Sequence, residues 1–429
     1  MLYGLIGGRL GHSYSKPIHE QLAGYTYDLC PLPTEAEVDA FMRARDFKAI
    51  NVTIPYKEFV MPYCDAIDDA ARAIGSVNTI VNRGGRLEGH NTDFAGLQWL
   101  LRRNGVSLKG KTVMLLGTGG TKKTAYAVAQ AEGAREIVVV SRRAGADTIP
   151  YEEAARRADV EVLVNTSPVG MYPDTGACLV DLANYPRLEA VVDVIYNPFR
   201  TELLLRAEAR GIKAVNGLGM LCAQAKYAAE YFTGTAIPDS AIARVSRSLH
   251  AGCSNLVLIG MPASGKTSVG MLCAELLGKR FVDADAEIEK RIGGPIASIL
   301  SPGNEKPFRD LESAVLSDLG KEGGLVIATG GGAVLRAENV RALRQNGVLV
   351  WLKRPLDALD VGGGRPLSQS REALGTMYQA RAPLYEAAAD ASVENTALPE
   401  DAAQRVKEKF DEIFDSEWAE PEHAGHSGT

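Results

Sequence analysis

The stretch GMPASGKTSVG, residues 260–270, decides the fold of the second half of the chain. It fits the pattern G-x-x-x-x-G-K-[ST] and lies between the apolar run NLVLIG and the helical stretch TSVGMLCAELLG. Its glycines let the backbone curl so that N–H groups face phosphate oxygens at a helix N-terminus. Lys266 would neutralise the terminal phosphates, and the Thr267 hydroxyl would hold Mg²⁺. Between a strand and a helix, the stretch predicts a nucleotide-binding loop rather than a chance glycine-rich turn.

Charged residues that follow this loop predict the kind of acceptor. FVDADAEIEKRIG places Asp283 and Asp285 at the end of the next apolar strand, on one face by the period of two, unless they only begin a solvated helix. Arg309 in PFRDLE, Arg365 in the lid-like GGGRPLS and Arg381 in RAPLYE add three guanidinium groups. VIATGGGAV ends another strand in glycines that bring bare backbone close to a ligand. Arginines bind carboxylates and aspartates accept from hydroxyls, so a small polyhydroxy acid is the predicted acceptor.

The order of these motifs resembles that of the shikimate kinase family over residues 255–415. The resemblance implies a transfer of phosphate from ATP, with Mg²⁺, to shikimate, and makes Lys266 a catalytic residue. The residues that it assigns to shikimate are Asp285, Arg309, Gly331, Gly332 and Arg381. Those that it assigns to ATP are Ala263, Ser264, Gly265, Lys266, Thr267, Ser268 and Arg365. Mg²⁺ would be held by Thr267 and, through water, by Asp283. One departure is PLDALDVGGGRP, which is short and acidic where the family commonly offers an arginine.

A second glycine turn, GTGGTKKT at 117–124, lies in the first half of the chain. It follows VMLLG and precedes a helical stretch and the apolar run EIVVVS, which together predict a βαβ unit. Gly117 and Gly119 match the first two glycines of the dinucleotide pattern G-x-G-x-x-[GA], but Lys122 occupies its last position.

The end of the next strand predicts which dinucleotide is bound. Ser141 is followed by Arg142 and Arg143, where an NAD site would have an acidic residue for the ribose 2′-hydroxyl. Two cations favour a 2′-phosphate and hence NADPH, although an exposed strand end is an alternative reading.

Small polar residues gather in several segments around this unit. GHSYSKP offers Ser13 and Ser15 on one side of an extended segment, and INVTIPYKE carries Thr53 and Lys57 around a proline that stops a strand. GSVNT and HNTDFAG add further Asn and Asp side chains. Each segment alone would be explained by turn chemistry. With NTSPVGMYP (165–173), DVIYNP and NGLGMLCAQA, however, they resemble the shikimate dehydrogenase family from residue 1 to about 245.

This second resemblance implies a set of site residues. The substrate pocket would be lined by Ser13, Ser15, Thr53, Asn78, Asp93, Tyr196 and Gln224. The NADP site would comprise Gly117, Gly119, Gly120, Thr121, Ser141, Arg142, Arg143, Val194 and Gly217. Lys57 and Asp93 would be catalytic, because hydride reduction of a ketone leaves an alkoxide that a lysine held by an aspartate can protonate. The departure from the family is TKKT, where Lys122 and Lys123 replace small residues.

Composition and length limit the remaining possibilities. The 429 residues, 46% hydrophobic and 23% charged, predict a globular α/β protein with more than one core. A net charge of −6 argues against nucleic-acid binding, and no apolar run reaches the roughly 20 residues that span a bilayer. The start MLYGLIGGRLGHS makes a poor signal peptide, and six scattered cysteines without a CxxC pair suit a reducing cytoplasm. Oligomeric state is not predicted.

The expected organisation places two enzymes in one chain. Residues 1–100 form the substrate domain, completed by about 220–245; residues 101–219 form a Rossmann-type NADP domain. Residues 246–254 form a linker, 255–416 a P-loop kinase domain with a parallel sheet, and 417–429 a disordered tail. Two nucleotide loops then serve two consecutive reactions, reduction of 3-dehydroshikimate and phosphorylation of shikimate. Two alternatives stay open: only one half is catalytic and the other binds or regulates, or the first half is an NAD-dependent quinate/shikimate dehydrogenase.

Overall fold

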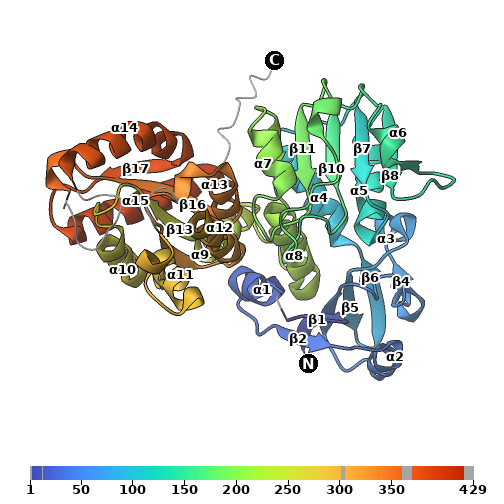
Figure 1. The fold of residues 1–429 in the computed structure, drawn as a ribbon. Helices are drawn as coiled ribbons and strands as arrows, with labels where there is room; N and C mark the ends of the chain where they lie inside the picture. Colours follow the sequence, from blue (N-terminus) through green and yellow to red (C-terminus); the bar gives the residue numbers. More distant parts are fainter. Residues whose placement is uncertain (1, 12, 301–304, 360–369, 420–429) are drawn as a thin grey trace, which may run out of the picture. The chain divides into compact units, whose positions relative to one another are not determined.

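The computed structural model describes residues 2–11, 13–300, 305–359 and 370–419 (Figure 1). The chain divides into two compact units. The first comprises Met1–Met171, Ala177–Ser248 and Trp418–Thr429, and the second comprises Tyr172–Gly176 and Leu249–Glu417. Arg365 and residues 420–429 of the tail expected over 417–429 lie outside the described residues.

The first sheet of the first unit is mixed, whereas the alternation of apolar runs and helices predicts parallel sheets nearly throughout. Its strands, in the order β2-β1-β3-β5-β6-β4, are Asp28–Pro31, Tyr3–Gly7, Ala49–Val52, Thr79–Arg83, Arg86–His90 and Ala66–Ile67. Strand β5 pairs antiparallel with both β3 and β6. The helices of this part are α1 (Ser15–Ala23), α2 (Glu35–Ala44), α3 (Asp69–Ile74) and α4 (Thr92–Arg103). The expectation of parallel strands was wrong here, because β5 and β6 form a hairpin around two glycines with positive φ, Gly84 and Gly85.

The second sheet of the first unit is parallel, as expected for a Rossmann-type domain. Its order is β12-β11-β10-β7-β8-β9, with bounds Lys213–Val215, Ala190–Asp193, Val162–Asn165, Thr112–Leu116, Glu136–Ser141 and Ile149–Pro150. Helices α5 (Gly120–Ala131), α6 (Tyr151–Ala154) and α7 (Glu202–Glu208) accompany it. Helix α8 (Leu218–Thr233) then returns to the first sheet, where it packs against α1, α4, β3 and β5. Both sheets of this unit therefore meet at α4 and α8.

The second unit has one parallel sheet with helices on both faces. Its order is β14-β15-β13-β16-β17, with bounds Arg280–Asp283, Leu325–Ala328, Asn255–Ile259, Gly347–Lys353 and Ala391–Glu394. Its helices are α10 (Lys266–Leu277), α11 (Ala284–Ile292), α12 (Lys306–Lys321), α13 (Ala337–Arg344), α14 (Arg371–Ala388) and α15 (Pro399–Trp418).

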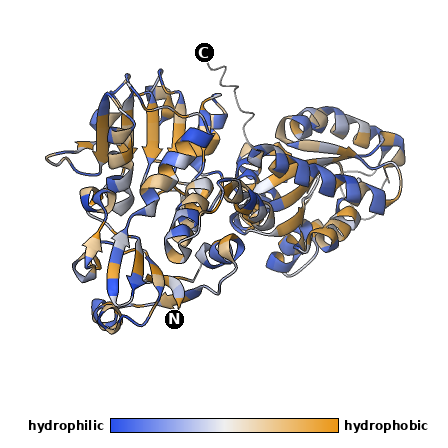
Figure 2. Cartoon of the chain, turned by 180° about the vertical axis from the view of Figure 1, so that it is seen from behind, coloured by the Kyte–Doolittle hydropathy of each residue, from blue (hydrophilic) through white to orange (hydrophobic). Residues whose placement is uncertain are grey.

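Alternation along the central strand builds the two cores of this unit. Leu256 and Leu258 pack with residues of α10 and α15, and Val257 and Ile259 pack with residues of α11, α12 and α14. Because successive side chains of a strand point to opposite faces, one apolar run is buried on both sides. Figure 2 accordingly shows the strands mostly in the hydrophobic colour, with hydrophilic residues on the outer helices.

The expected linker is a helix. Residues 246–253 belong to α9 (Ser240–Cys253), and the boundary between the two units falls inside it. The polar composition of SRSLHAGCS concealed a helical spacing of buried apolar residues at Ile242, Val245 and Leu249. Lys279 ends this helix, because its amine donates to the carbonyl groups of residues 251, 252 and 254 at 2.7–2.9 Å.

The C-terminal helix α15 runs to Trp418, one residue beyond the expected start of the tail at 417. Among the described helices, none combines the length and the apolar character that a membrane crossing requires.

Two candidate active sites

The first unit contains a cavity of about 440 Å³ that collects the residues expected to bind substrate. Most of them lie at or near the ends of strands of the first sheet or at the starts of the helices that accompany it. The Rossmann-type part contributes the rest. The lining includes Ser13, Ser15, Thr53, Lys57, Asn78, Asp93, Thr121, Val194, Tyr196, Gly217 and Gln224. Arg9 and Asn51 also line it and were not among the predicted site residues. The remaining expected NADP residues, at the glycine turn and after β8, lie outside this cavity.

Lys57 and Asp93 form an ion pair in this cavity. The Lys57 amine lies 2.6 Å from Asp93 Oδ2, and the two side chains are 23% and 15% exposed. Lys57 follows β3 in a turn, whereas Asp93 stands in the first turn of α4, whose N-terminus is capped by Asn91. The pair therefore joins two elements that are separated in sequence, and it holds an ammonium group at the cavity wall.

A buried hydrogen-bond network fixes the polar floor of the cavity. Asn51 donates to the Asn78 carbonyl at 3.2 Å and to Thr79 Oγ1 at 3.1 Å, and it accepts from the Tyr27 hydroxyl at 2.7 Å. Asn78 Oδ1 accepts from the backbone N–H of Thr92 at 2.8 Å. Because a backbone N–H can only donate, this contact fixes the amide orientation and leaves the Asn78 NH₂ group available to a ligand.

Ser13 and Ser15 both line the cavity, but they are not on one side of an extended segment. Ser15 is the first residue of α1, and its N–H donates to Ser13 Oγ at 3.2 Å. A serine side chain that turns back to the backbone two residues on is typical of helix entry. The expected extended geometry was therefore wrong.

The glycine turn after β7 leaves open space before the N-terminus of α5. Gly117 has φ +103°, and a Cβ there would lie 3.0 Å from Ser167 Cβ. Gly119 caps α5 and Gly120 begins it; a Cβ on either would meet no atom within 4 Å, and the first turn of α5 has no acidic residue. Open space in front of free helix N–H groups suits an anion.

The two lysines of TKKT are engaged elsewhere. Lys123 pairs with Glu58 at 2.7 Å, and the Lys122 amine lies 5.9 Å from the centre of the Tyr126 ring. Ser141, Arg142 and Arg143 follow at the end of β8, next to the strand that carries the glycine turn. The Ser141 hydroxyl bonds to the Arg143 backbone, which orders this turn.

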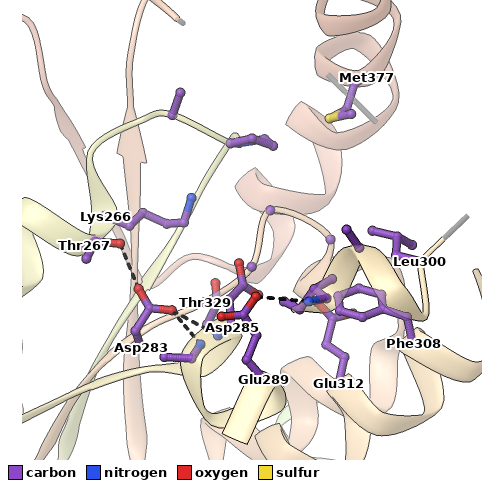
Figure 3. Close-up of a pocket in the computed structure, with 18 of the residues that line it drawn as sticks. Lys266, Thr267, Asp283, Asp285, Glu289, Leu300, Phe308, Glu312, Thr329 and Met377 are labelled. Carbon is purple, nitrogen blue, oxygen red and sulfur yellow. Dashed lines mark hydrogen bonds between the residues drawn. The ribbon is translucent and has the colours of Figure 1, made fainter. Parts of the chain in front are cut away.

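The second unit contains a larger cavity, of about 720 Å³, around the loop at 260 (Figure 3). It brings together the residues expected for shikimate, most of those for ATP and both of those for the metal. The expected residues in its lining are Ala263, Gly265, Lys266, Thr267, Ser268, Asp283, Asp285, Arg309, Gly331, Gly332 and Arg381. Ser264, itself a residue of the loop, is buried and is not part of the lining.

The loop is held in a curled form by its own residues. Lys266 Nζ donates to the carbonyl groups of Gly260 and Met261 at 3.0 and 2.8 Å. Gly265 has φ +92°, and a Cβ there would come within 2.5 Å of the Asn395 amide, which itself donates to the Ser264 carbonyl. Glycine is therefore required at 265, both for the backbone conformation and for the close approach of Asn395.

Asp283 and Asp285 line the cavity, but they do not share the face of a strand. Strand β14 ends at Asp283, which caps α11 by accepting from the N–H groups of residues 285 and 286, and Asp285 is already helical. Asp285 thus belongs to a helix start, but this start is not the solvated one that the sequence left as an alternative, because both aspartates line the cavity. The free oxygen of Asp283 accepts from the Thr267 hydroxyl at 2.9 Å, and Figure 3 shows these two side chains joined.

Helices α12 and α14 together contribute acidic and basic side chains to the cavity. Arg309 Nη1 lies 2.7 Å from Glu312, and Arg381 donates to the Gly331 carbonyl at 2.9 Å. A Cβ at Gly332 would collide with the Arg309 guanidinium group, so the glycine gives that group its place. Burial, together with the nearby Asp283 and Glu312 carboxylates, raises the pKa of Asp285 to about 6.

One cation at this cavity was missed from the sequence. Arg354 follows β16 and lines the cavity beside Gly265, and its Nε donates to the Ala358 carbonyl at 3.0 Å. Arg354 directly precedes the acidic segment PLDALDVGGGRP, where the family resemblance predicts an arginine. Its position directly after an apolar strand was the available signal, since the loops of a parallel sheet gather at the carboxyl ends of its strands.

No group of three or more His, Cys, Asp or Glu residues within the described ranges is arranged to hold a metal by itself. The Thr267–Asp283 pair fits Mg²⁺ that is carried in with nucleotide oxygens, because both groups offer hard oxygen ligands.

Folds and sites together define a Rossmann-type dehydrogenase followed by a P-loop kinase. Residues 5–80 match the family model of the shikimate dehydrogenase substrate binding domain, and residues 262–412 match that of shikimate kinase. The shikimate dehydrogenase (NADP(+)) of Clostridium perfringens strain 13 is 34% identical over 256 residues, covering 56% of this chain and 94% of its own. That of Halothermothrix orenii is 36% identical over 266 residues, covering 54% and 90%.

Solved structures agree with these relatives. A chorismate mutase/shikimate 5-dehydrogenase fusion protein from Clostridium acetobutylicum is 33% identical with a TM-score of 0.55, over 58% of this chain and 96% of that one. Shikimate 5-dehydrogenase from Thermus thermophilus, in complex with NADP(H) and shikimate, is 30% identical with a TM-score of 0.52, over 58% and 99%. The chain belongs to the shikimate dehydrogenase (NADP) family in its first part and carries a shikimate kinase domain in its second. Both families that the sequence motifs resemble are thereby confirmed.

Proposed function

We propose that the chain catalyses two consecutive reactions, reduction of 3-dehydroshikimate to shikimate with NADPH and phosphorylation of shikimate to shikimate 3-phosphate with ATP. The observation that carries the proposal is that two cavities each hold a different set of polar groups. One cavity holds the Lys57–Asp93 pair, and the other holds the phosphate loop together with Asp285 and two arginines.

In the first reaction NADPH supplies a hydride to the ketone carbon. Lys57, which pairs with Asp93 at 2.6 Å, donates a proton to the oxygen on which negative charge develops. The free NH₂ of Asn78 and the hydroxyls of Ser13 and Ser15 orient the ring hydroxyls and the carboxylate. The pyrophosphate of the cofactor would lie at Gly119 and Gly120.

In the second reaction Lys266 and the loop N–H groups hold the transferred phosphate, and Mg²⁺ would be held by Thr267 and, through water, by Asp283. The ionised carboxylate of Asp285 anchors the acceptor hydroxyl. Arg309 and Arg381 bind the carboxylate of shikimate. The hydroxyl that receives the phosphate is the one created by the reduction. We place both reactions in the reducing cytoplasm, in keeping with six free cysteine thiols.

The preference for NADPH should depend on Arg142 and Arg143. Replacing both with Ala should raise the KM for NADPH about tenfold or more, since one charge-assisted hydrogen bond is worth about 1.5–3 kcal/mol. The KM for NADH should not change. Arg210→Ala, an exposed arginine that lines neither cavity, is the matched control. An unchanged NADPH/NADH ratio in the double variant would contradict the assignment and favour the NAD-dependent alternative.

A further inference from the structure

Asp193 is a buried carboxylate that neither reaction uses. It ends β11, is 0% exposed and lines neither cavity. The residues directly after it do line the substrate cavity, namely Val194 and Tyr196. Asp193 therefore stands behind the wall of the first active site.

Three neutral groups donate to this carboxylate. Oδ1 accepts from the Ile195 N–H at 3.1 Å and from Asn165 Nδ2 at 3.0 Å. Oδ2 accepts from the Thr201 hydroxyl at 2.8 Å, and Thr201 in turn caps α7. One side chain thus binds the end of β10, the loop after β11 and the start of the following helix.

The contacts of Asn165 extend this network to the glycine turn. Asn165 Oδ1 accepts from the Ser167 hydroxyl at 2.7 Å and from its N–H at 3.1 Å. Ser167 packs against Gly117, where a Cβ would lie 3.0 Å from the serine Cβ. The backbone of Asn165 accepts from the Val194 N–H at 3.1 Å. The loops after β7, β10 and β11 are therefore tied together behind the site.

The loop after β12 is fastened to the same segment. The Gly217 N–H donates to the Ile195 carbonyl at 2.9 Å, and a Cβ at Gly217 would collide with the Val194 carbonyl. Val194, Tyr196 and Gly217, which all face the cavity, thus take their positions from a segment that Asp193 holds from behind.

Folding alone does not call for a carboxylate here. Burial raises the pKa of Asp193 to about 7 despite its three donors, so the ionised group is destabilised relative to water. An amide of the same shape would avoid that cost, but its NH₂ group would face donors that the carboxylate accepts from and would disturb the network. A positioning residue is expected to order the wall of a site even at a cost in stability, and Asp193 does both.

We propose that Asp193 is a positioning residue of the reductase site, which fixes Val194 and Tyr196 relative to the glycine turn so that the nicotinamide and the ketone meet in reacting geometry. The inference rests on the proposed reduction. Asp193 would affect the turnover only through the neighbouring residues that it positions.

Asp193→Asn in the full chain is the direct test. The turnover of ketone reduction should fall about 10–100-fold, because small displacements of a positioned reactant cost this much. The rate of phosphorylation should not change. The same substitution at Asp181, an exposed helix cap that lines neither cavity, should leave the turnover as it is.

The thermal midpoint separates positioning from mere structural support. Because the folded-state pKa of Asp193 is raised, its contribution to stability is present at low pH and is lost as pH rises through about 7. Asp193→Asn should therefore unfold at a temperature no lower than that of the wild type at pH 6, and at a higher one at pH 8. A lower midpoint that accompanies the loss of turnover would overturn the proposal, and so would wild-type turnover.

Thr201 provides a second pair of variants. Thr201→Ser keeps the donor to Asp193 and should keep the turnover, whereas Thr201→Val removes the donor and should lower it. Equal turnover in the two would contradict the proposal. Absence of reduction in the wild type would instead count against the proposed function, and the midpoints would still decide whether Asp193 costs stability.

Discussion

Lys57→Ala should lower the turnover of ketone reduction by roughly 10²–10⁴-fold, the usual worth of a positioned acid–base group. The variant lacks the ammonium group that stands 2.6 Å from Asp93 and faces the developing alkoxide. Phosphorylation of shikimate should proceed at the wild-type rate, because the described residues that line the kinase cavity all belong to the second unit.

Lys57→Arg tests whether the reduction depends on the proton of Lys57 or only on its positive charge. A guanidinium group keeps the positive charge beside Asp93 but cannot give up its proton near neutral pH. We expect substrate to bind and turnover to remain low. Lys16→Ala, which removes an exposed amine paired with Glu20, is the control. Ketone reduction at the wild-type rate by Lys57→Ala would exclude Lys57 from the mechanism.

Asp285→Asn should reduce phosphoryl transfer to shikimate by about 10²-fold or more while ATP binding is retained. The acceptor hydroxyl loses its anionic anchor, but the loop, Lys266 and the Thr267–Asp283 pair stay in place. Lys266→Ala should instead weaken the phosphate side, because it removes the cation that faces the transferred group. Fluorescent nucleotide titration and a coupled ADP assay measure the two effects separately.

The pH dependence of the wild type checks the same carboxylate. Its pKa is raised to about 6, so the rate of phosphorylation should fall as pH decreases through 6, and Asp285→Asn should lack this step. Because the pKa is raised, the contribution of this carboxyl group to stability is present below its ordinary pKa and is lost as pH rises through about 6. Asp285→Asn should thus unfold at a higher temperature than the wild type at pH 7. Asp318→Asn, in an exposed pair with Arg291, should change neither property.

The parts of the fold that the sequence predicts best are those in which chemistry and local structure coincide. The loop at 260 needs a strand before it and a helix after it, and the structure has both, β13 and α10. The same holds for the glycine turn between β7 and α5. In each case a phosphate requires a helix N-terminus, so one motif fixes three elements.

The hairpin, helix α9 and the role of Asp193 were not predicted, because no binding or catalytic motif in the sequence specifies them. Gly84 and Gly85 are a hairpin signal, but the polar residues of the flanking segments GSVNT and HNTDFAG are equally typical of a binding site. Helix α9 was overlooked because its apolar spacing begins before the polar stretch that resembled a linker. Asp193 begins the segment DVIYNP, but its contacts could not be predicted, since only the packed structure brings Asn165 and Thr201 to its oxygens.

One assay of the full chain tests the central claim, that a single protein performs both reactions. The chain is given 3-dehydroshikimate, NADPH, ATP and Mg²⁺, and the products are followed by mass spectrometry together with NADPH oxidation. We predict that shikimate 3-phosphate accumulates, with NADPH oxidised and ADP formed in equal amounts. Shikimate that accumulates while ATP is untouched, or ATP that is consumed only when shikimate is added and never with 3-dehydroshikimate, would contradict the account.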